Sequence, residues 1–342
     1  MDNLLTIIIP TYNRSNGLKE LLASIYNHNL DKKMNLEVIV SDDSTNEKEI
    51  KYIMLCVSYY RDICYHNITY IRNKYNRVGP AANRQNGLDN ATGKWVLFVD
   101  DDDILYQFDD ELIQKLYQDD ISYIITHYDT FDYDRNIPVV FTNDNSVQKC
   151  LTHGKIYNRQ FIKDNGIHYD ITAPAHEDIY FNYWCYSATL NNPEYHVEYL
   201  LDKKYIFYHF KYYSKSLSKS DNFFHNYISE QPLWFLNKFD APLGYAISNR
   251  NITQDIFDFI KNEVCYSIIM YLKSIEWSCN TEENMDLYKK YFDTLKTAFR
   301  GKINEEGLSK ISIEVLYENG LVNEINQILQ YFTIIQKLFL EV

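Results

Sequence analysis

The most informative scarcity in this chain of 342 residues is positive charge, since 34 Lys and Arg stand against 47 Asp and Glu and the formal net charge is −13. No basic patch stands out, so we expect no nucleic-acid partner. The six cysteines form no CxxC pair and follow no secretion signal, which predicts reduced thiols in a cytosolic protein. No apolar run approaches the roughly 20 residues that cross a bilayer, and the apolar residues 4–9 are too few for the core of a signal peptide.

Negative charge, in contrast, is concentrated in residues 94–103, KWVLFVDDDD, where an apolar run of strand length ends in four aspartates. An unpaired buried carboxylate is costly, so the aspartates must lie where the strand reaches the surface. In an open α/β sheet this carboxyl edge is where ligands bind. Crowded carboxylates repel one another, and Mg²⁺ or Mn²⁺ would relieve the repulsion and could hold a diphosphate. A solvated acidic loop is the alternative, but the same pattern recurs in VSDDS at residues 40–44.

The first hundred residues alternate between apolar runs of strand length and segments with helical spacing. We expect strands at residues 4–10, 36–40, 68–71 and 94–99, and helices at residues 17–29, 46–60 and 79–90. This order predicts an α/β fold with a mostly parallel, doubly wound sheet. The first strand is not followed by GxGxxG, so the dinucleotide fingerprint is missing. Four strand ends should therefore converge on one edge, with residues 11–13, 42–43, 73–77 and 100–103.

The remaining sequence predicts a helix at 109–119, strands at 123–126, 139–141 and 204–209, and a helix that starts at residue 175. From about residue 221 the pattern changes to long amphipathic segments, so we expect a catalytic domain at 1–220 and a helical C-terminal domain at 221–342 that shapes the acceptor site or mediates assembly. Its last apolar stripe favours packing within that domain, with a homo-oligomer contact as the alternative. Membrane contact should be peripheral at most, because the stripe lacks Lys and Arg. The stripe consists of Val322, Ile325, Ile328, Leu329, Phe332, Ile335, Leu338 and Phe339.

Five motifs in order resemble those of family 2 inverting glycosyltransferases with the GT-A fold. IIIPTYNR at residues 7–14 is similar to the opening strand of that family, and VSDDST at 40–45 to its VDDGST motif, with Asp43 in place of the glycine. NRVGPAANRQNG at 76–87 resembles the NxxGxxxARNxG segment, and the run that ends in residues 100–103 matches the DxDD segment. Glu177-Asp178 stands at the E-D pair. The resemblance covers residues 4–218.

The resemblance implies a nucleotide site at the edge of the sheet. Tyr12 would lie against the base, with core packing as the alternative. Asp42 aligns with the aspartate that accepts from the base, but the altered turn leaves the choice between Asp42 and Asp43 open. Arg84 would lie near the diphosphate or the aspartates, with a surface helix position as the alternative. The nucleotide-binding residues implied in this way are Pro10, Thr11, Tyr12, Arg14, Asp42, Asp43, Arg84, Asp100 and Asp101.

The resemblance also implies a metal site and a general base. Asp102 would ligate Mn²⁺ or Mg²⁺ directly, and Asp100 would contact ribose or a metal-bound water. His209 would be a third ligand or a diphosphate contact, with a structural histidine as the alternative. Asp101 and Asp103 would be supporting charges. Glu177 and Asp178 would supply the base, Asp178 foremost, with simple helix N-terminal charge as the alternative. The expected diphosphate contacts are Lys211, Lys215 and Ser216.

The function implied is transfer of a sugar from a nucleotide-diphosphate donor, with UDP favoured, to an acceptor hydroxyl in bacterial surface polysaccharide or glycoprotein synthesis. The acceptor would be a glycan, a lipid-linked glycan or a protein, and the location cytoplasmic or at the inner face of the membrane. A non-catalytic nucleotide-sugar-binding partner subunit is the alternative, which the intact Glu177-Asp178 pair disfavours. A nucleotidyltransferase would need a Gly-rich basic loop after residues 4–10, and that loop is missing. The sugar, the acceptor and the linkage stay open.

Overall fold

The computed structural model of the chain describes residues 3–28, 33–64, 67–75, 79–132, 137–141, 151–171 and 177–212. All of these belong to the first of two compact units, residues 1–214. The domain boundary predicted near residue 220, the C-terminal helices, and the oligomer and membrane contacts assigned to them lie outside the described residues and stay predictions.

The described strands form two sheets, one of seven strands in the order β10-β6-β9-β4-β1-β2-β3 and one of four in the order β5-β11-β7-β8. The strands are β1 (Leu5–Thr11), β2 (Leu36–Asp42), β3 (Asn67–Arg72), β4 (Trp95–Phe98), β5 (Ile104–Leu105), β6 (Ile121–Thr126), β7 (Tyr128–Asp132), β8 (Ile137–Phe141), β9 (Lys155–Asn158), β10 (His196–Leu200) and β11 (Tyr208–Tyr212). The helices are α1 (Ser15–Asn27), α3 (Glu47–Cys64), α4 (Pro80–Asn90), α5 (Asp110–Lys115), α6 (Arg159–Asp164), α7 (Glu177–Asn191) and the 3₁₀ helix η2 (Lys203–Tyr205).

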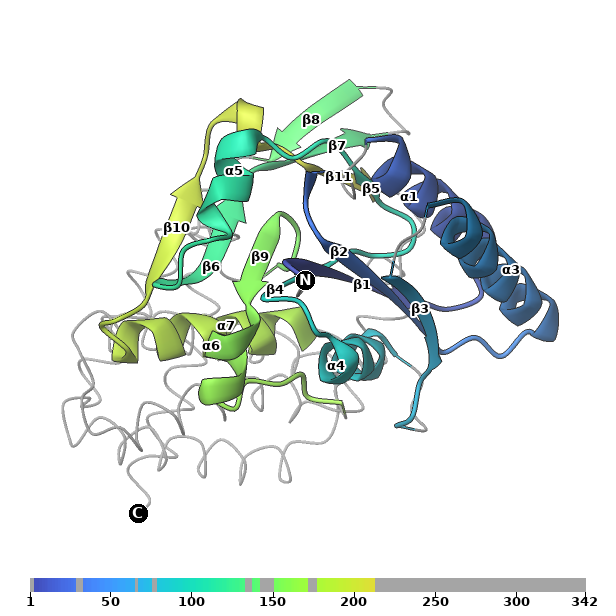
Figure 1. Cartoon of the computed structure of the whole chain (residues 1–342), viewed down its shortest axis with the longest axis horizontal. Coiled ribbons are helices and arrows are strands. Elements are labelled where there is room, and N and C mark those ends of the chain that lie inside the picture. Colours follow the sequence, from blue (N-terminus) through green and yellow to red (C-terminus); the bar gives the residue numbers. More distant parts are fainter. Residues whose placement is uncertain are drawn as a thin grey trace, which may run out of the picture. The chain divides into compact units, whose positions relative to one another are not determined.

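The central strands β1, β2 and β4 are buried along their whole length because helices cover both faces of the sheet. Successive side chains of a strand point to opposite faces. Ile7 and Ile9 accordingly share a core cluster with Leu18 of α1, whereas Ile8 points to α4, where its Cγ2 lies 2.2 Å from the position a Cβ on Gly87 would take. Figure 1 shows α1 and α3 on one side of the sheet and α4 on the other. The mostly parallel, doubly wound sheet is therefore confirmed.

Strand β9 is the exception within the large sheet, because it runs antiparallel to both of its neighbours, β4 and β6. The other neighbouring pairs are parallel. Leu97 of β4 pairs with Ile156 of β9. Since the two strands run in opposite directions, the residues that precede β9 come to the edge where β4 ends. Neither β9 nor α6 was predicted from the sequence.

The small sheet forms next to the aspartate run. The two residues of β5, directly after Asp103, pair antiparallel with β11, and β11 pairs parallel with β7. The strand predicted at residues 204–209 is wrong in its first half, because the Asp202 side chain accepts from the Lys204 amide and caps η2 instead. The helix predicted at 109–119 is shorter, because α5 ends at Lys115. The helices predicted in the first hundred residues, and the strand segments predicted up to residue 141, are confirmed to within a few residues.

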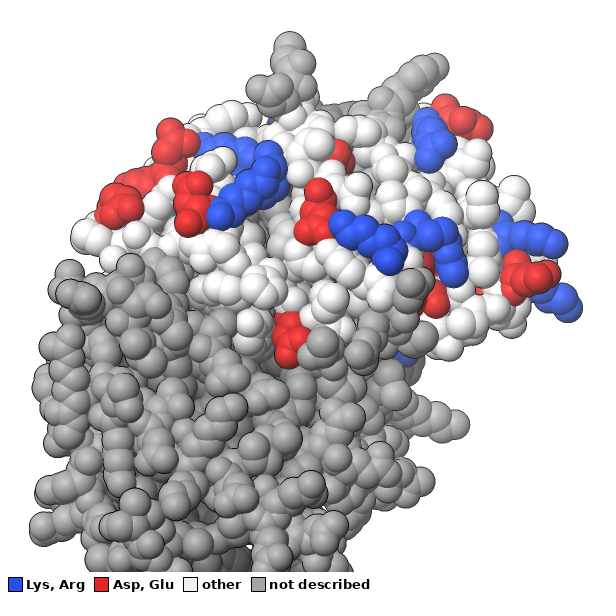
Figure 2. All heavy atoms as spheres, turned by 90° about the horizontal axis from the view of Figure 1, so that it is seen from below, with Lys and Arg blue, Asp and Glu red and all other residues white. Residues whose placement is uncertain are grey.

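Two features of the described residues bear on partners. None of their helices has the length and apolar character needed to span a membrane. On the face shown in Figure 2, Lys and Arg are interspersed with Asp and Glu over the described residues and do not gather into one basic area. On this face an anionic ligand would therefore be bound by local groups and not by a general positive surface.

Candidate active site

The carboxyl ends of the four parallel strands β1, β2, β3 and β4 meet at one edge of the large sheet. The backbone amide of Asp43 donates to the carbonyl of Thr11 over 3.0 Å, and that of Asn73 donates to the carbonyl of Asp42 over 3.0 Å. The amide of Val99 likewise donates to the carbonyl of Ile8 over 3.0 Å. The predicted convergence of strand ends is confirmed for the described residues, with residues 76–77 outside them.

The four aspartates form a turn at the end of β4, closed by a 3.0 Å hydrogen bond from the Asp103 amide to the Asp100 carbonyl. Asp101 is buried, and its Oδ2 accepts from the Thr11 hydroxyl at 2.6 Å. Asp102 accepts at Oδ2 from Arg14 Nη1 at 2.5 Å. These contacts direct Asp101 and Asp102 towards the end of β1 and the start of α1.

Asp103 is turned in another direction, towards β11. It is fully buried, and it accepts from the Tyr208 hydroxyl at 2.6 Å and from the Lys211 amide at 2.9 Å. The second sheet makes these contacts because β5, directly after Asp103, pairs with β11. Asp103 thus fastens β11 to the end of β4, a larger role than the supporting charge that the sequence predicted.

Arg84 connects this turn to α7. Its Nη2 donates to Asp100 Oδ1 at 2.6 Å, and its Nη1 donates to Glu177 Oε1. The Arg84 side chain is 6% exposed and the Glu177 side chain 9%. Burial opposes the charge of the guanidinium, but Asp100 and Glu177 hold its pKa well above the usual range. The predicted place of Arg84 near the aspartates is confirmed. The alternative, a position on the exposed surface of the helix, is wrong because the side chain is buried.

The carboxyl groups of the turn carry more negative charge than the two arginines offset. Burial raises the pKa of Asp101 to about 7, against the Thr11 hydrogen bond, which lowers it. Burial and the other aspartates raise the pKa of Asp102 and raise that of Asp103 well above its usual range. Asp100 differs, because Arg84 overcomes the effect of burial and lowers its pKa. A further positive charge at the turn would stabilise all of these carboxylates.

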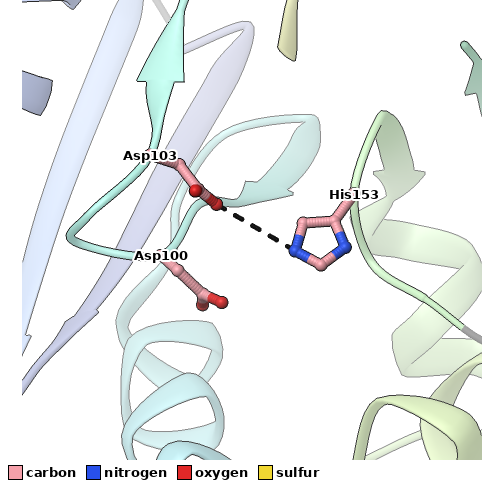
Figure 3. Close-up of side chains that lie close together, drawn as sticks. All are labelled: Asp100, Asp103 and His153. Atoms are coloured by element: carbon pink, nitrogen blue, oxygen red, sulfur yellow. Dashed lines mark ion pairs between the residues drawn. The ribbon is translucent and has the colours of Figure 1, made fainter. Parts of the chain in front are cut away.

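His153 lies beside this turn, two residues before β9. Its Nε2 is 4.0 Å from Asp103 Oδ2, and ligand atoms of Asp100, Asp103 and His153 all lie within 4.8 Å of one another. Figure 3 shows the three side chains around one shared space. Both ring nitrogens of His153 are buried without a hydrogen-bond partner, and burial lowers its pKa to about 4, so the ring is neutral. A neutral imidazole beside two carboxylates is a set of donors that a divalent cation can use.

Asp42 and Asp43, the two candidates for a contact with the nucleotide base, differ in burial and in hydrogen-bond partners. Asp42 is fully buried and accepts from the Tyr70 hydroxyl and from Arg72 Nη1, both at 2.7 Å. Asp43 is half-buried, and its Oδ2 accepts from the Gly79 amide at 2.9 Å. Both carboxylates therefore have internal partners, and the choice between them stays a prediction.

Tyr12, at the carboxyl end of β1, is 43% exposed. Its hydroxyl lies 3.4 Å from Thr45 Oγ1 and its amide 3.4 Å from Asp101 Oδ2. The ring is therefore not part of the core, and the core-packing alternative does not hold. Pro10, in contrast, lies buried within β1, where it pairs with Ser41.

The predicted residues on β11 have partners of their own. His209 Nδ1 lies 2.8 Å from Asp129 Oδ1, its partner in the parallel register of β7 and β11. Lys211 Nζ donates to Glu20 Oε2 at 2.5 Å. The role of His209 as a metal ligand and that of Lys211 as a diphosphate contact stay predictions. Lys215 and Ser216 lie outside the described residues.

His153 and Arg72 were not predicted from the sequence, and Asp103 was predicted only as a supporting charge. The available signal for His153 was positional, since continuing the Leu97–Ile156 register of β4 and β9 sets residue 153 opposite Asp100. That signal becomes readable only once β9 is known to be antiparallel. The signal for Arg72 was its place at the end of the third predicted strand.

Comparison with known proteins agrees with this geometry. Residues 6–175 match the family model described as Glycosyl transferase family 2. A stretch of 101 residues, 30% of this chain, is 38% identical to a GalNAc(5)-diNAcBac-PP-undecaprenol beta-1,3-glucosyltransferase of Campylobacter jejuni and covers 30% of that protein. A stretch of 197 residues, 53% of this chain, is 26% identical to the poly(ribitol-phosphate) beta-N-acetylglucosaminyltransferase TarS of Staphylococcus aureus and covers 32% of it. The matched parts thus span less than a third of these relatives.

Solved structures confirm the predicted GT-A fold. The structure of S. aureus TarS 1–349 in complex with UDP-GlcNAc aligns with a TM-score of 0.51 and 19% identity, over 93% of this chain and 92% of that one. The same TarS fragment in complex with UDP aligns with a TM-score of 0.50, over the same shares of both chains. Through its residues 6–175, the chain belongs to glycosyl transferase family 2.

Proposed function

We propose that this protein is an inverting glycosyltransferase that moves a sugar from a nucleoside-diphosphate donor, with a UDP-sugar favoured, to an acceptor hydroxyl. The observation that carries the proposal is the ion-pair chain in which Arg84 joins Asp100 to Glu177. This chain ties the aspartate turn after β4 to the acidic first turn of α7. We therefore assign the groups for leaving-group departure and for acceptor activation to one site.

Asp178 is the proposed general base. Glu177 is committed to Arg84 and buried, whereas Asp178 is half-buried, and its charge acts on the same guanidinium. A carboxylate that takes the proton of the attacking hydroxyl contributes about 10²- to 10⁴-fold in rate. Attack from the side opposite the diphosphate inverts the anomeric carbon. In this scheme Glu177 holds the first turn of α7 in place through Arg84, and Asp178 performs the proton transfer.

The nucleotide is proposed to bind along the ends of β1 and β2. The exposed ring of Tyr12 offers a flat surface for the base, and Asp42 or Asp43 would accept from its N–H group. Thr11 and Arg14 position Asp101 and Asp102 by direct hydrogen bonds. The nucleotide side of the site is thus built from the same contacts that fix the turn.

A divalent cation, Mn²⁺ or Mg²⁺, when bound would supply charge neutralisation for the departing diphosphate. The residues present fit such an ion. Burial raises the pKa values of Asp101, Asp102 and Asp103, and a bound cation would favour the ionised form of all three carboxylates. The unpartnered nitrogens of His153 lie beside them. The ion would be held within residues 100–103, where the sequence predicts Asp100 and Asp102 as ligands.

The acceptor is proposed to be a glycan of the bacterial surface, either lipid-linked or part of a cell-wall polymer, glycosylated on the cytoplasmic side. The names of the C. jejuni and S. aureus relatives, which specify an undecaprenol-linked glycan and poly(ribitol phosphate), support this class. The structure of TarS with UDP-GlcNAc supports a UDP-sugar donor.

The first test is a thermal-shift panel of UDP-GlcNAc, UDP-glucose, GDP-mannose, dTDP-glucose and a CMP-sugar, each with and without Mn²⁺. A donor at 100 times its Kd adds about 2.7 kcal/mol to the free energy of unfolding. We expect a UDP-sugar to raise the melting temperature most, and more with Mn²⁺ than without. If no nucleotide sugar shifts it, the proposed function is wrong.

The second test measures UDP release by the wild type and by Asp178→Asn, with Asp62→Asn on the exposed face of α3 as the matched control. Asp178→Asn should lower turnover by about 10²- to 10⁴-fold and leave the donor-induced thermal shift intact. Asp62→Asn should change neither quantity. Equal turnover in the wild type and Asp178→Asn would remove the base assignment, and donor binding without turnover in the wild type would favour the non-catalytic partner subunit.

A further inference from the structure

We propose that His153 is a nitrogen ligand of the divalent cation, on the side of the aspartate turn where Asp100 and Asp103 lie. This inference rests on the metal dependence proposed above. It puts His153 in the place of His209 in the predicted ligand set.

The geometry of the turn separates the two sides. Asp102 Oδ2 is 2.5 Å from Arg14 Nη1, so its carboxylate already has a strong cationic partner near the start of α1. Asp100 and Asp103 face the other way, towards His153 (Figure 3). Their ligand atoms and a ring nitrogen of His153 lie within 4.8 Å of one another. Around an ion with bonds of about 2.1 Å, neighbouring ligands lie about 3 Å apart and opposite ligands about 4.2 Å apart, so the three groups need to move together by roughly 1–2 Å when the ion binds.

The condition of His153 itself points to a missing partner. Both ring nitrogens are buried with no hydrogen-bond partner, although a buried polar group almost always has one. The ring is enclosed by aromatic rings, with centroid distances of 5.3 Å to Tyr208 and 4.7 Å to Phe210. These rings hold the imidazole in place beside Asp100 and Asp103. An ion between the imidazole and the carboxylates would satisfy a nitrogen and both acidic groups.

His209 is less suited to this role in the structure. Its Nδ1 lies 2.8 Å from Asp129 Oδ1, on the pair of strands β7 and β11. His153, in contrast, is brought to Asp100 by the antiparallel register of β4 and β9. The histidine that lies at the proposed ion site is therefore His153, which precedes β9 of the large sheet, and not His209 on β11, which the sequence predicted.

A nitrogen ligand has a consequence for metal choice. Carboxylate and water oxygens suit Mg²⁺, whereas imidazole favours transition-metal ions. We therefore expect Mn²⁺ to bind more tightly than Mg²⁺ to the wild type, and we expect this preference to shrink when His153 is replaced by a residue without an imidazole.

The test is electron spin echo envelope modulation of Mn²⁺ bound to the full chain in the presence of UDP, because this method detects ¹⁴N directly bonded to the ion. Wild type, His153→Gln, His153→Phe and His209→Gln are compared, and the Mn²⁺ Kd is measured from the free-ion EPR signal. We expect nitrogen modulation in the wild type and in His209→Gln, its loss in both His153 variants, and an increase in their Kd of about tenfold or more.

Each outcome has a defined meaning. Mn²⁺ binding without nitrogen modulation in the wild type overturns the inference and leaves metal-dependent transfer standing. Modulation that survives in a folded His153 variant, or disappears in His209→Gln, also overturns it. Absence of Mn²⁺ binding to the wild type with UDP contradicts the proposed metal dependence itself. His153→Phe preserves the aromatic packing, so it serves if His153→Gln does not fold; if neither folds, the His209→Gln spectrum decides.

Discussion

The buried pair of Arg84 and Glu177 should couple strongly in a double-mutant cycle. Arg84→Met leaves the Glu177 carboxylate, 9% exposed, without its guanidinium. Breaking a buried ion pair from one side lowers the free energy of unfolding by about 3–5 kcal/mol. Glu177→Gln alone should lower it by about 1.5–3 kcal/mol, because Arg84 keeps Asp100 as a partner at 2.6 Å. The single variants should therefore differ in cost.

The double variant Arg84→Met/Glu177→Gln removes both buried charges, and Asp100, with 32% of its side chain exposed, can be hydrated. Its loss of stability should be smaller than the sum of the two single losses by about 1.5–3 kcal/mol. The assay is urea unfolding followed by far-UV circular dichroism at pH 7.5 without divalent cations. The coupling energy is read from the four unfolding free energies.

The control is the pair of Lys74 and Asp89, an ion pair at 2.6 Å whose side chains are 53% and 28% exposed and whose aspartate also lies on α4. An exposed pair contributes about 0–1 kcal/mol, so the cycle with Lys74→Met and Asp89→Asn should give a coupling below that of the buried pair. Equal coupling in the two cycles would refute the reasoning, because it would mean that burial adds nothing to the interaction of Arg84 with Glu177.

Three further results are expected. Gly87→Ala should lower the free energy of unfolding by about 1–3 kcal/mol in urea, because its Cβ would meet Ile8 Cγ2 at 2.2 Å; an unchanged midpoint would mean that α4 does not pack on β1 in this way. Tyr208→Phe should lower it by about 1–3 kcal/mol, since it removes the 2.6 Å hydroxyl donor to buried Asp103; the same melts measure this, and no loss would contradict that contact. Cys185, whose thiol pKa is raised by burial, should resist iodoacetamide under native conditions more than half-buried Cys56, as peptide mass spectrometry would show; preferential labelling of Cys185 would argue against its burial.

The secondary structure of the first hundred residues was predictable because it follows from local sequence patterns. Apolar runs of strand length, helical spacing and an abrupt run of aspartates each depend on neighbours in the sequence. Ile8 could therefore be placed in a strand that is buried on both faces. Asp101 could be placed at the carboxyl end of the neighbouring strand β4. The motif resemblance added Arg84 and Glu177, which the structure joins directly.

The parts that could not be predicted depend on distant partners. Strand β9 contains Lys155, which is fully buried and whose ammonium donates to Asn182 of α7 at 2.8 Å. A lysine in a four-residue run gives no sign of burial until that partner is known. The position of His153 depends on the pairing of β9, so it could not be predicted from the sequence either. Likewise, the start of β11 is fixed by β5 and β7 and not by the residues before it.

The antiparallel course of β9 has a consequence for how the site can diversify. A loop that leads into a parallel strand enters the sheet at the edge remote from Asp100. The residues directly ahead of β9 arrive instead at the edge that carries the aspartate turn, as the position of His153 shows. In the proposed glycosyltransferase, insertions or exchanges ahead of this one strand would alter the acceptor preference while the sheet itself is left untouched.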